Sequence, residues 1–353
     1  MTGRVAIVGA NGRIGGELAL RLSGRENLDV VGICRNPSGS AFLRLCGVTC
    51  RHADVADPAQ AKAALADCDV VFQLAYRAPR SRSEALANRA VVRNCVVSAP
   101  AGAHVITAST IMVYAPEIAL RVPDAYGWEK LSLERVARRG AIGTSRLLTI
   151  LRIGHALGPL QPQSVEIMTA LRHGSVMLPD CGARPSNTVF VATLADAVAR
   201  AAVGALSTGT FDAVTSPQWT WANVFRHHAE EGHYVSQLVG GDTSSSLRDL
   251  VRSRARIILA LAPDALAERA YGLHLRRRAS YQPTTRARRI EDRPHVTPAT
   301  GWRAVGSQAL PGILDPREAL LRYPLSDLSW ADIVPRAGWS LRTHGSRGDG
   351  ERE

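Results

Sequence analysis

The sequence of 353 residues predicts an α/β fold with a doubly wound parallel sheet, followed by a smaller, mostly helical region. Two observations carry this prediction. Over roughly the first 150 residues, short apolar runs alternate with helical patterns, which is typical of a parallel sheet covered by helices on both faces. The apolar runs are continuous, as strands buried on both sides require.

The individual elements follow from these runs and from their flanking residues. The expected strands are Val5–Val8, Val30–Ile33, Val48–His52, Val70–Leu74, Val105–Ala108 and Leu147–Ile153. The expected helices are Ile14–Leu22, Pro58–Ala66, Glu84–Ser98 and Tyr126–Arg138. Beyond residue 153 glycine and proline become common, and we expect Val189–Val191 and Thr210–Val214 to return to the sheet as strands.

Composition excludes several classes of protein. No apolar run approaches the ~20 residues that a transmembrane helix needs, and Val5–Ala10 is too short for a signal sequence, so we expect a cytoplasmic protein. The six cysteines show no C-x-x-C spacing, and the histidines near residue 230 lack H-x-x-E-H spacing. We therefore expect no disulfide framework and no metal.

The net charge of +12 rests almost entirely on arginine, because only two of the 43 basic residues are lysine, Lys62 and Lys130. A codon bias toward arginine is the simple explanation. Against that bias, a lysine indicates a position where a compact ammonium is required.

A glycine loop, Gly9-Ala10-Asn11-Gly12-Arg13-Ile14-Gly15, links the first expected strand to the first helix. In this spacing the first glycine allows a tight turn, the second lets a pyrophosphate approach backbone N–H groups, and the third lets helix and strand pack closely. The helix N-terminus adds partial positive charge. A structural turn is the alternative, but the strand and helix around the loop favour a Rossmann-type dinucleotide site. We expect contacts with the cofactor from Gly9, Asn11, Gly12, Arg13, Ile14 and Gly15.

Arg35 at the end of the second strand favours NADP over NAD, because an acid there would hold the ribose 2′-hydroxyl whereas an arginine suits a 2′-phosphate. A surface arginine in an arginine-rich chain is the competing explanation. Asp54, after the third strand, is placed to meet the adenine amino group, or it is a solvated loop residue.

Tyr126 and Lys130 stand four residues apart on one face of an expected helix. A free tyrosine has a pKa of about 10, and a neighbouring ammonium lowers it. Such a phenol can exchange a proton with a substrate oxygen while hydride moves at the adjacent carbon. Thr110, after the fifth strand, could hold the same oxygen, and Ser109 is the competing hydroxyl. Tyr114 is interpreted as a packing residue.

With these residues in place, the chain resembles the extended short-chain dehydrogenase/reductase superfamily, its NAD-dependent epimerase/dehydratase group, over residues 4–215. The resemblance includes the glycine loop, Asp54-Val55, the D-x-V-x-x-L-A stretch ending at Leu74-Ala75, two asparagines of the third helix, Tyr126 and Lys130 with Glu134, and Leu151-Arg152. It implies a bound nicotinamide cofactor, a Thr110–Tyr126–Lys130 catalytic set, cofactor contacts at Val55, Leu74 and Ala75, and a homodimer.

Two departures from the family pattern argue against a nucleotide-sugar substrate. His155 stands where such members usually carry asparagine, and Ser186-Asn187 replaces an arginine-led pair, with Arg184 two residues early. We take His155 and Arg184, with Ser109, as candidate substrate contacts.

These residues divide the chain into a dinucleotide-binding Rossmann domain at 1–153, with return strands near 189–214, and a substrate-binding region at 154–188 and 215–335. Residues 340–353 are polar and charged and are expected to be disordered.

The leading hypothesis is an NADP-preferring oxidoreductase that interconverts a ketone and an alcohol. The alternative is an epimerase or dehydratase of an activated sugar, and a third possibility is a cofactor-sensing regulator, which typically lacks the tyrosine–lysine pair. Residues 240–308 contain thirteen arginines and only six acidic residues. This excess suits an acidic or carrier-bound small-molecule substrate, or a membrane surface, or simply a solvated face. We expect no nucleic-acid partner.

Overall fold

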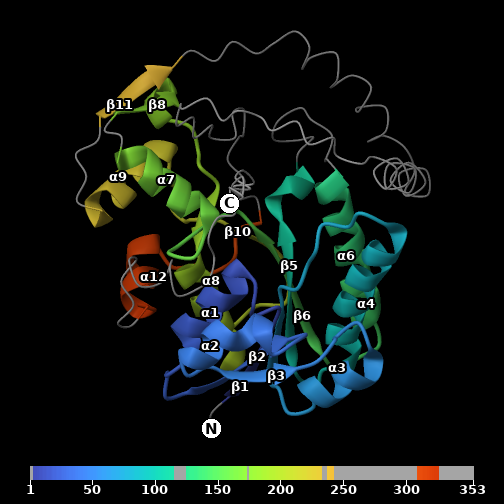
Figure 1. The fold of residues 1–353 in the computed structure, drawn as a ribbon. Coiled ribbons are helices and arrows are strands. Elements are labelled where there is room, and N and C mark those ends of the chain that lie inside the picture. Colours follow the sequence, from blue (N-terminus) through green and yellow to red (C-terminus); the bar gives the residue numbers. More distant parts are fainter. Residues whose placement is uncertain (1–2, 115–124, 173–174, 233–236, 242–307, 326–353) are drawn as a thin grey trace, which may run out of the picture.

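Seven parallel strands form the central sheet of the computed structural model, which describes residues 3–114, 125–172, 175–232, 237–241 and 308–325 (Figure 1). Their order is β10-β6-β5-β4-β1-β2-β3. The strands are β1 (Gly3–Val8), β2 (Leu28–Cys34), β3 (Thr49–His52), β4 (Val70–Gln73), β5 (His104–Thr110), β6 (Leu147–Ile153) and β10 (Gly209–Ala213). From β1 the chain adds β2 and β3 on one side, and it then crosses over to add β4, β5 and β6 on the other side of β1. This is the doubly wound arrangement that the sequence predicts.

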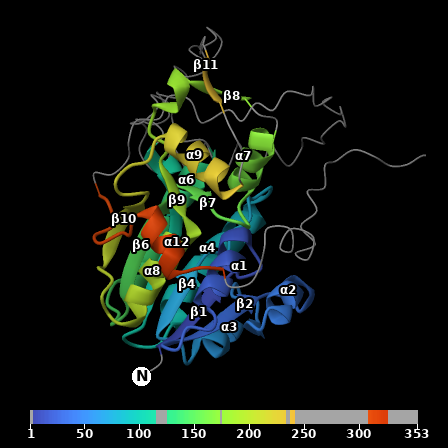
Figure 2. The ribbon, with the colours of Figure 1, turned by 90° about the vertical axis from the view of Figure 1, so that its left-hand side faces the viewer.

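Helices cover both faces of this sheet (Figures 1 and 2). On one face lie α3 (Pro58–Leu65), α4 (Arg82–Ser98) and α6 (Ala125–Ala141). On the other lie α1 (Arg13–Leu22) and α8 (Val191–Ala202), and α12 (Pro316–Arg322) packs on α8. The short α2 (Ala41–Leu45) follows β2. Side-chain caps mark the starts of α3 and α4, where Asp57 accepts from Gln60 N and Ser81 accepts from Glu84 N.

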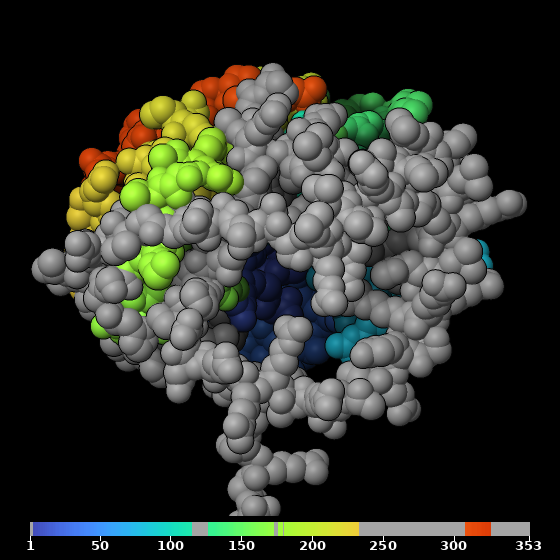
Figure 3. All heavy atoms as spheres, turned by 90° about the horizontal axis from the view of Figure 1, so that it is seen from above, coloured from blue at the N-terminus to red at the C-terminus, as the bar shows by residue number. Residues whose placement is uncertain are grey.

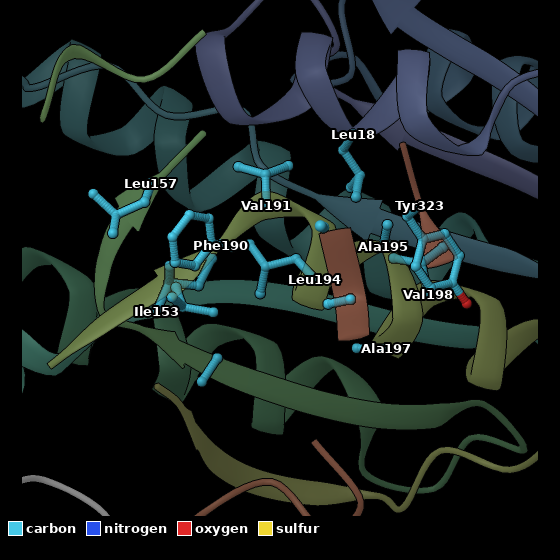
Figure 4. Close-up of a cluster of buried hydrophobic side chains, with 14 of the residues drawn as sticks. Leu18, Ile153, Leu157, Phe190, Val191, Leu194, Ala195, Ala197, Val198 and Tyr323 are labelled. Atoms are coloured by element: carbon cyan, nitrogen blue, oxygen red, sulfur yellow. The ribbon is translucent and has the colours of Figure 1, made fainter. Parts of the chain in front are cut away.

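The core on the α1 and α8 side draws together distant parts of the chain (Figure 4). Leu194 and Val198 of α8 are buried with Leu18 of α1, and Tyr323 from the end of α12 joins them. The Tyr323 hydroxyl donates to Asp196 Oδ1 at 3.1 Å. Residues 308–325 therefore pack on the dinucleotide-binding half, although the sequence assigned them to the substrate-binding region.

A second group of elements lies above the carboxyl edge of the sheet in Figure 1. It contains β7 (His155–Leu157) paired with β9 (Thr188–Phe190), β8 (Ser175–Pro179) paired with β11 (Gln237–Gly241), and the helices α7 (Pro162–Arg172) and α9 (Trp221–Glu231). Its described part is thus mixed, with strand pairs as well as helices.

Both expected return strands form, but only one of them joins the main sheet. The strand expected at Val189–Val191 is β9 (Thr188–Phe190), which pairs with β7 outside the main sheet and ends where Val191 begins the buried helix α8. The strand predicted at Thr210–Val214 is β10, which pairs with β6 at the sheet edge. Most of the arginine-rich segment and the C-terminal tail lie outside the described residues.

Two further findings bear on the class of protein. None of the helices in the described ranges has the length and apolar character that a bilayer span requires. All six cysteines are free.

Candidate functional site

A cavity of about 330 Å³ opens at the carboxyl edge of the sheet, where β1 through β4 end. Seen from above (Figure 3), the N-terminal residues in dark blue lie at the bottom of a hollow at this edge. Eight of the expected cofactor contacts line the cavity: Gly9, Asn11, Gly12, Arg35, Asp54, Val55, Leu74 and Ala75. These residues come from four different strand ends, so the parallel sheet brings together what the sequence separates.

The glycine loop is packed so closely that side chains would not fit. Gly9 has φ +89°, and a Cβ on it would lie 2.7 Å from the backbone of Ala75. A Cβ on Gly15 would lie 2.4 Å from the Gly9 carbonyl oxygen. Gly12 is the N-cap of α1 and, having no side chain, supplies no cap to the first turn. This loop and helix start match the cradle that a pyrophosphate requires.

Arg35 and Asp54 line the cavity just beyond the ends of the paired strands β2 and β3. Arg35 is exposed directly after β2. The Asp54 carboxylate accepts from Ala56 N at 3.0 Å, which fixes the turn after β3. Arg13, Ile14 and Gly15 do not line the cavity, because they belong to the first turn of α1 behind the loop.

Two buried asparagines of α4 hold the loops that form the cavity wall. Asn88 Nδ2 donates to the Arg77 carbonyl at 2.8 Å and its Oδ1 accepts from Arg77 N at 3.3 Å. Asn94 Nδ2 donates to the carbonyls of Val55 and Ala56 at 2.9 and 3.0 Å. Asn88 thus holds the loop after β4, and Asn94 holds the loop after β3.

Tyr126 and Lys130 lie on α6, beside the loop that follows β4. Lys130 is 5% exposed, and its Nζ donates to the Ala108 carbonyl of β5 at 3.2 Å. The ammonium lies 5.9 Å from the centre of the Tyr126 ring and 4.3 Å from that of Tyr76. Burial lowers the pKa of Lys130 to about 8, against the opposing effect of the Glu129 and Glu134 carboxylates. The ammonium form therefore still predominates at pH 7.

The two candidate hydroxyls at the end of β5 have different partners. Thr110 Oγ1 accepts from Met112 N at 3.2 Å, which leaves its own proton for another acceptor. Ser109 Oγ donates to Glu134 Oε1 at 2.6 Å, on the α6 side of the sheet. Ser109, expected as a substrate contact, is engaged by α6 instead.

Glu134 of α6 and Arg152 of β6 form a buried ion pair between the sheet and the helix that carries Tyr126 and Lys130. Arg152 Nε and Nη2 donate to the two carboxylate oxygens of Glu134 at 3.0 Å each, and Arg152 Nη1 donates to the Tyr114 hydroxyl. Burial acts to raise the pKa of Glu134, but the hydrogen bonds from Arg152 and Ser109 hold it below its ordinary value. Tyr114 is therefore a hydrogen-bonded anchor as well as a packing residue.

The other two expected substrate contacts lie away from the cavity lining. His155 is in β7, its ring 5.9 Å from that of Trp221, and burial lowers its pKa. Arg184 Nε donates to Asp180 Oδ2 at 2.5 Å. Both belong to the group of elements above the sheet, where the substrate-binding region was expected.

Sequence reasoning overlooked Tyr76, which lines the cavity and contacts Lys130. The signal was available, since Tyr76 directly follows the L-A pair at the end of β4, and residues at that edge of a parallel sheet face the ligand.

Comparisons with known proteins agree with this geometry. Residues 9–156 match a family model described as NAD(P)H-binding. Among solved structures, UDP-glucose 4-epimerase from Thermotoga maritima superposes with a TM-score of 0.52 at 17% identity, over 69% of this chain and 87% of that one. UDP-N-acetylglucosamine 4-epimerase from Bacillus cereus gives a TM-score of 0.52 at 17% identity, over 78% of this chain and 100% of that one. No curated protein sequence matches the chain.

At such identities the two solved structures show a shared fold, while the family model covers the segment that holds the glycine loop, Tyr126 and Lys130. The expectation of an NAD or NADP cofactor is confirmed at that level. Residues 9–156 therefore match an NAD(P)H-binding family model, within a fold that the chain shares with these two solved structures.

Proposed function

We propose that the chain is an NADP-preferring oxidoreductase that interconverts a ketone and an alcohol. The observation that carries this proposal is the position of the Tyr126–Lys130 pair. Lys130 is buried against Tyr76, and Tyr76 lines the same cavity as the glycine loop. Tyr76 therefore contacts the tyrosine–lysine pair and also faces the proposed cofactor site.

The chain's residues would divide the work of cofactor binding as follows. The loop around Gly9 and Gly12 would hold the pyrophosphate on backbone N–H groups. Arg35 would hold the 2′-phosphate of NADP, and Asp54 would meet the adenine. A bound nicotinamide dinucleotide supplies hydride in reduction and accepts it in oxidation.

Tyr126 would donate its phenolic proton to the carbonyl oxygen in reduction and take it back in oxidation. The Lys130 ammonium favours the phenolate left behind, and it can do so at neutral pH because its pKa is about 8. Thr110, whose hydroxyl proton is uncommitted to Met112, would donate to the same substrate oxygen. These three residues would move and stabilise the one proton of each direction, while the nicotinamide dinucleotide would supply or accept the one hydride.

Two alternatives use the same core. The two solved structures named above act on UDP-sugars, and an epimerase or dehydratase would use the same residues with retained cofactor. The departures at His155 and at Ser186-Asn187 favour the oxidoreductase. A cofactor-sensing regulator is disfavoured because the tyrosine–lysine pair is present. We keep residues 154–188 and 215–335 as the substrate-binding region, apart from residues 308–325, which pack on the dinucleotide-binding half. A cytoplasmic location and a homodimer are parts of the proposal.

The test is a titration of the purified protein with NADPH and NADH by calorimetry, together with a check for co-purifying cofactor. Exchangeable binding that prefers NADPH, with turnover of a carbonyl panel that Tyr126→Phe abolishes while cofactor binding persists, supports the proposal. Retained NAD that survives purification supports the epimerase alternative. Binding of neither nucleotide refutes both.

A further inference from the structure

Tyr76 contacts both members of the tyrosine–lysine pair and the cavity. It lies three residues beyond the end of β4 and lines the cavity wall. Its ring meets the Tyr126 ring edge to face, with centroids 5.5 Å apart and planes at 69°. The Lys130 ammonium lies over the same ring at 4.3 Å from its centre, nearer than to the Tyr126 ring.

Lys130 depends on few groups to keep its charge. Its Nζ donates to the Ala108 carbonyl at 3.2 Å, and the charged groups acting on it are Glu129 and Glu134 of its own helix. From α4, Asn88 faces Glu129 rather than the lysine, at 3.5 Å. The negative face of an aromatic ring favours a cation within about 6 Å. The Tyr76 ring therefore supports an ammonium that burial disfavours.

Tyr126 is more exposed than Lys130. It is the second residue of α6, and its side chain is 36% exposed. Burial alone therefore does not fix the direction of its hydroxyl, whereas an edge-to-face contact prefers one ring orientation.

We propose that Tyr76 is a positioning residue whose ring holds the Lys130 ammonium and orients the Tyr126 ring at the mouth of the cofactor cavity. The role in turnover rests on the function proposed above, whereas the contact with Lys130 can be measured without any substrate. The role is assigned to the Tyr76 ring, which makes both contacts.

The scarcity of lysine makes the measurement direct. The protein contains two lysines, so isotope labelling of lysine gives two side-chain signals in NMR. Lys62 is exposed on α3 and serves as an internal reference. The variants are Tyr76→Leu, which replaces the ring with an apolar group that keeps water out, and Tyr76→Phe, which keeps the ring.

In Tyr76→Leu the titration midpoint of Lys130 falls by about one pH unit, as loss of a desolvated cation–ring contact requires. In Tyr76→Phe it stays within a few tenths of the wild-type midpoint, and Lys62 is unchanged throughout. An unmoved or raised midpoint in Tyr76→Leu overturns the proposal, and so does an equal fall in Tyr76→Phe.

Kinetics supply the second readout. Tyr76→Leu lowers kcat on the order of tenfold or more and shifts its pH profile, with little change in NADPH affinity, while Tyr76→Phe restores both. A loss confined to NADPH affinity would make Tyr76 a simple wall residue and overturn the positioning role. If wild-type protein turns over no carbonyl while the Lys130 midpoint still responds to Tyr76→Leu, the proposed function fails and the contact stands.

Discussion

Arg152→Met tests whether the buried ion pair behind α6 holds the candidate catalytic helix in place. Arg152 is the shared partner of Glu134, on that helix, and of Tyr114, just beyond Thr110. The side chains of Arg152 and Glu134 are 13% and 1% exposed. Methionine keeps most of the aliphatic stem and removes the charge and the donors.

The expected loss is about 3 kcal/mol in the free energy of unfolding. Removing one partner of a buried pair costs roughly 3–5 kcal/mol, because the other charge stays buried without compensation. The lower end applies here, since Glu134 keeps its contacts with Ser109 at 2.6 Å and with Arg138 at 2.9 Å. Arg138→Met is the matched control: it removes a donor to the same carboxylate from a side chain that is 45% exposed, so it should cost less than about 1 kcal/mol.

Urea unfolding of both variants, followed by circular dichroism, gives the two free energies. Equal losses, or a loss below about 1 kcal/mol in Arg152→Met, would refute the reasoning that burial makes the Arg152 contact the stronger one.

The same pair predicts a pH dependence. The pKa of Glu134 is lower in the folded protein than its ordinary value, so its stabilising effect is fully present above that ordinary value. The effect is lost as the pH falls through the folded-state value. The difference between wild type and Arg152→Met should therefore narrow in acid, and a gap that widens there would contradict the assignment.

The remaining predictions concern the cofactor cavity. Arg35→Glu should weaken NADPH binding about 10- to 150-fold, the equivalent of one or two hydrogen bonds to a charged group, and leave NADH binding within about threefold. Arg93→Glu, an exposed arginine of α4, is its control, and equal effects on both nucleotides would make Arg35 a surface residue. Gly15→Ala should destabilise the protein by about 1–3 kcal/mol in thermal unfolding, because its Cβ would lie 2.4 Å from the Gly9 carbonyl oxygen. Gly12→Ala, with its Cβ 3.1 Å from the same oxygen, should cost less; the reverse order would refute the packing argument.

Local constraints made the sheet and the glycine loop predictable. The close approach of Gly15 to Gly9 lies within one strand–turn–helix unit, so the spacing of glycines records it. The strand expected at Val189–Val191 forms as β9, but its pairing with β7 outside the main sheet was not predicted. A short buried apolar run shows neither its partner strand nor the residue at which a following helix begins, here Val191.

The sequence predicted only some of the contacts between segments that are distant along the chain. Glu134 and Arg152 each belong to a recognisable pattern, but nothing in the sequence says that they pair, because the contact joins a helix to a strand after an intervening turn. The partner of Ser109 was hidden for the same reason: strand alternation places its side chain on the α6 face, and only the packing of α6 brings a carboxylate there. Substrate contacts were the hardest to predict because the candidates His155 and Arg184 lie on elements above the sheet, far from any pattern shared with the glycine loop.

Glu17 shows how a charged residue can join two regions that the sequence treats separately. In a helical pattern a glutamate is placed on the solvent face, yet Glu17 is fully buried, and burial raises its pKa. Arg21 donates to its Oε1 at 2.9 and 2.8 Å, while Leu160 N and Gln161 Nε2 donate to its Oε2 at 3.1 and 2.8 Å. A Cβ on Gly158 would lie 2.2 Å from Glu17 Oε1, so the glycine there is required by the carboxylate. A buried charge has to keep every one of these partners. These hydrogen bonds therefore fix the segment 158–161 to α1, the helix that follows the glycine loop.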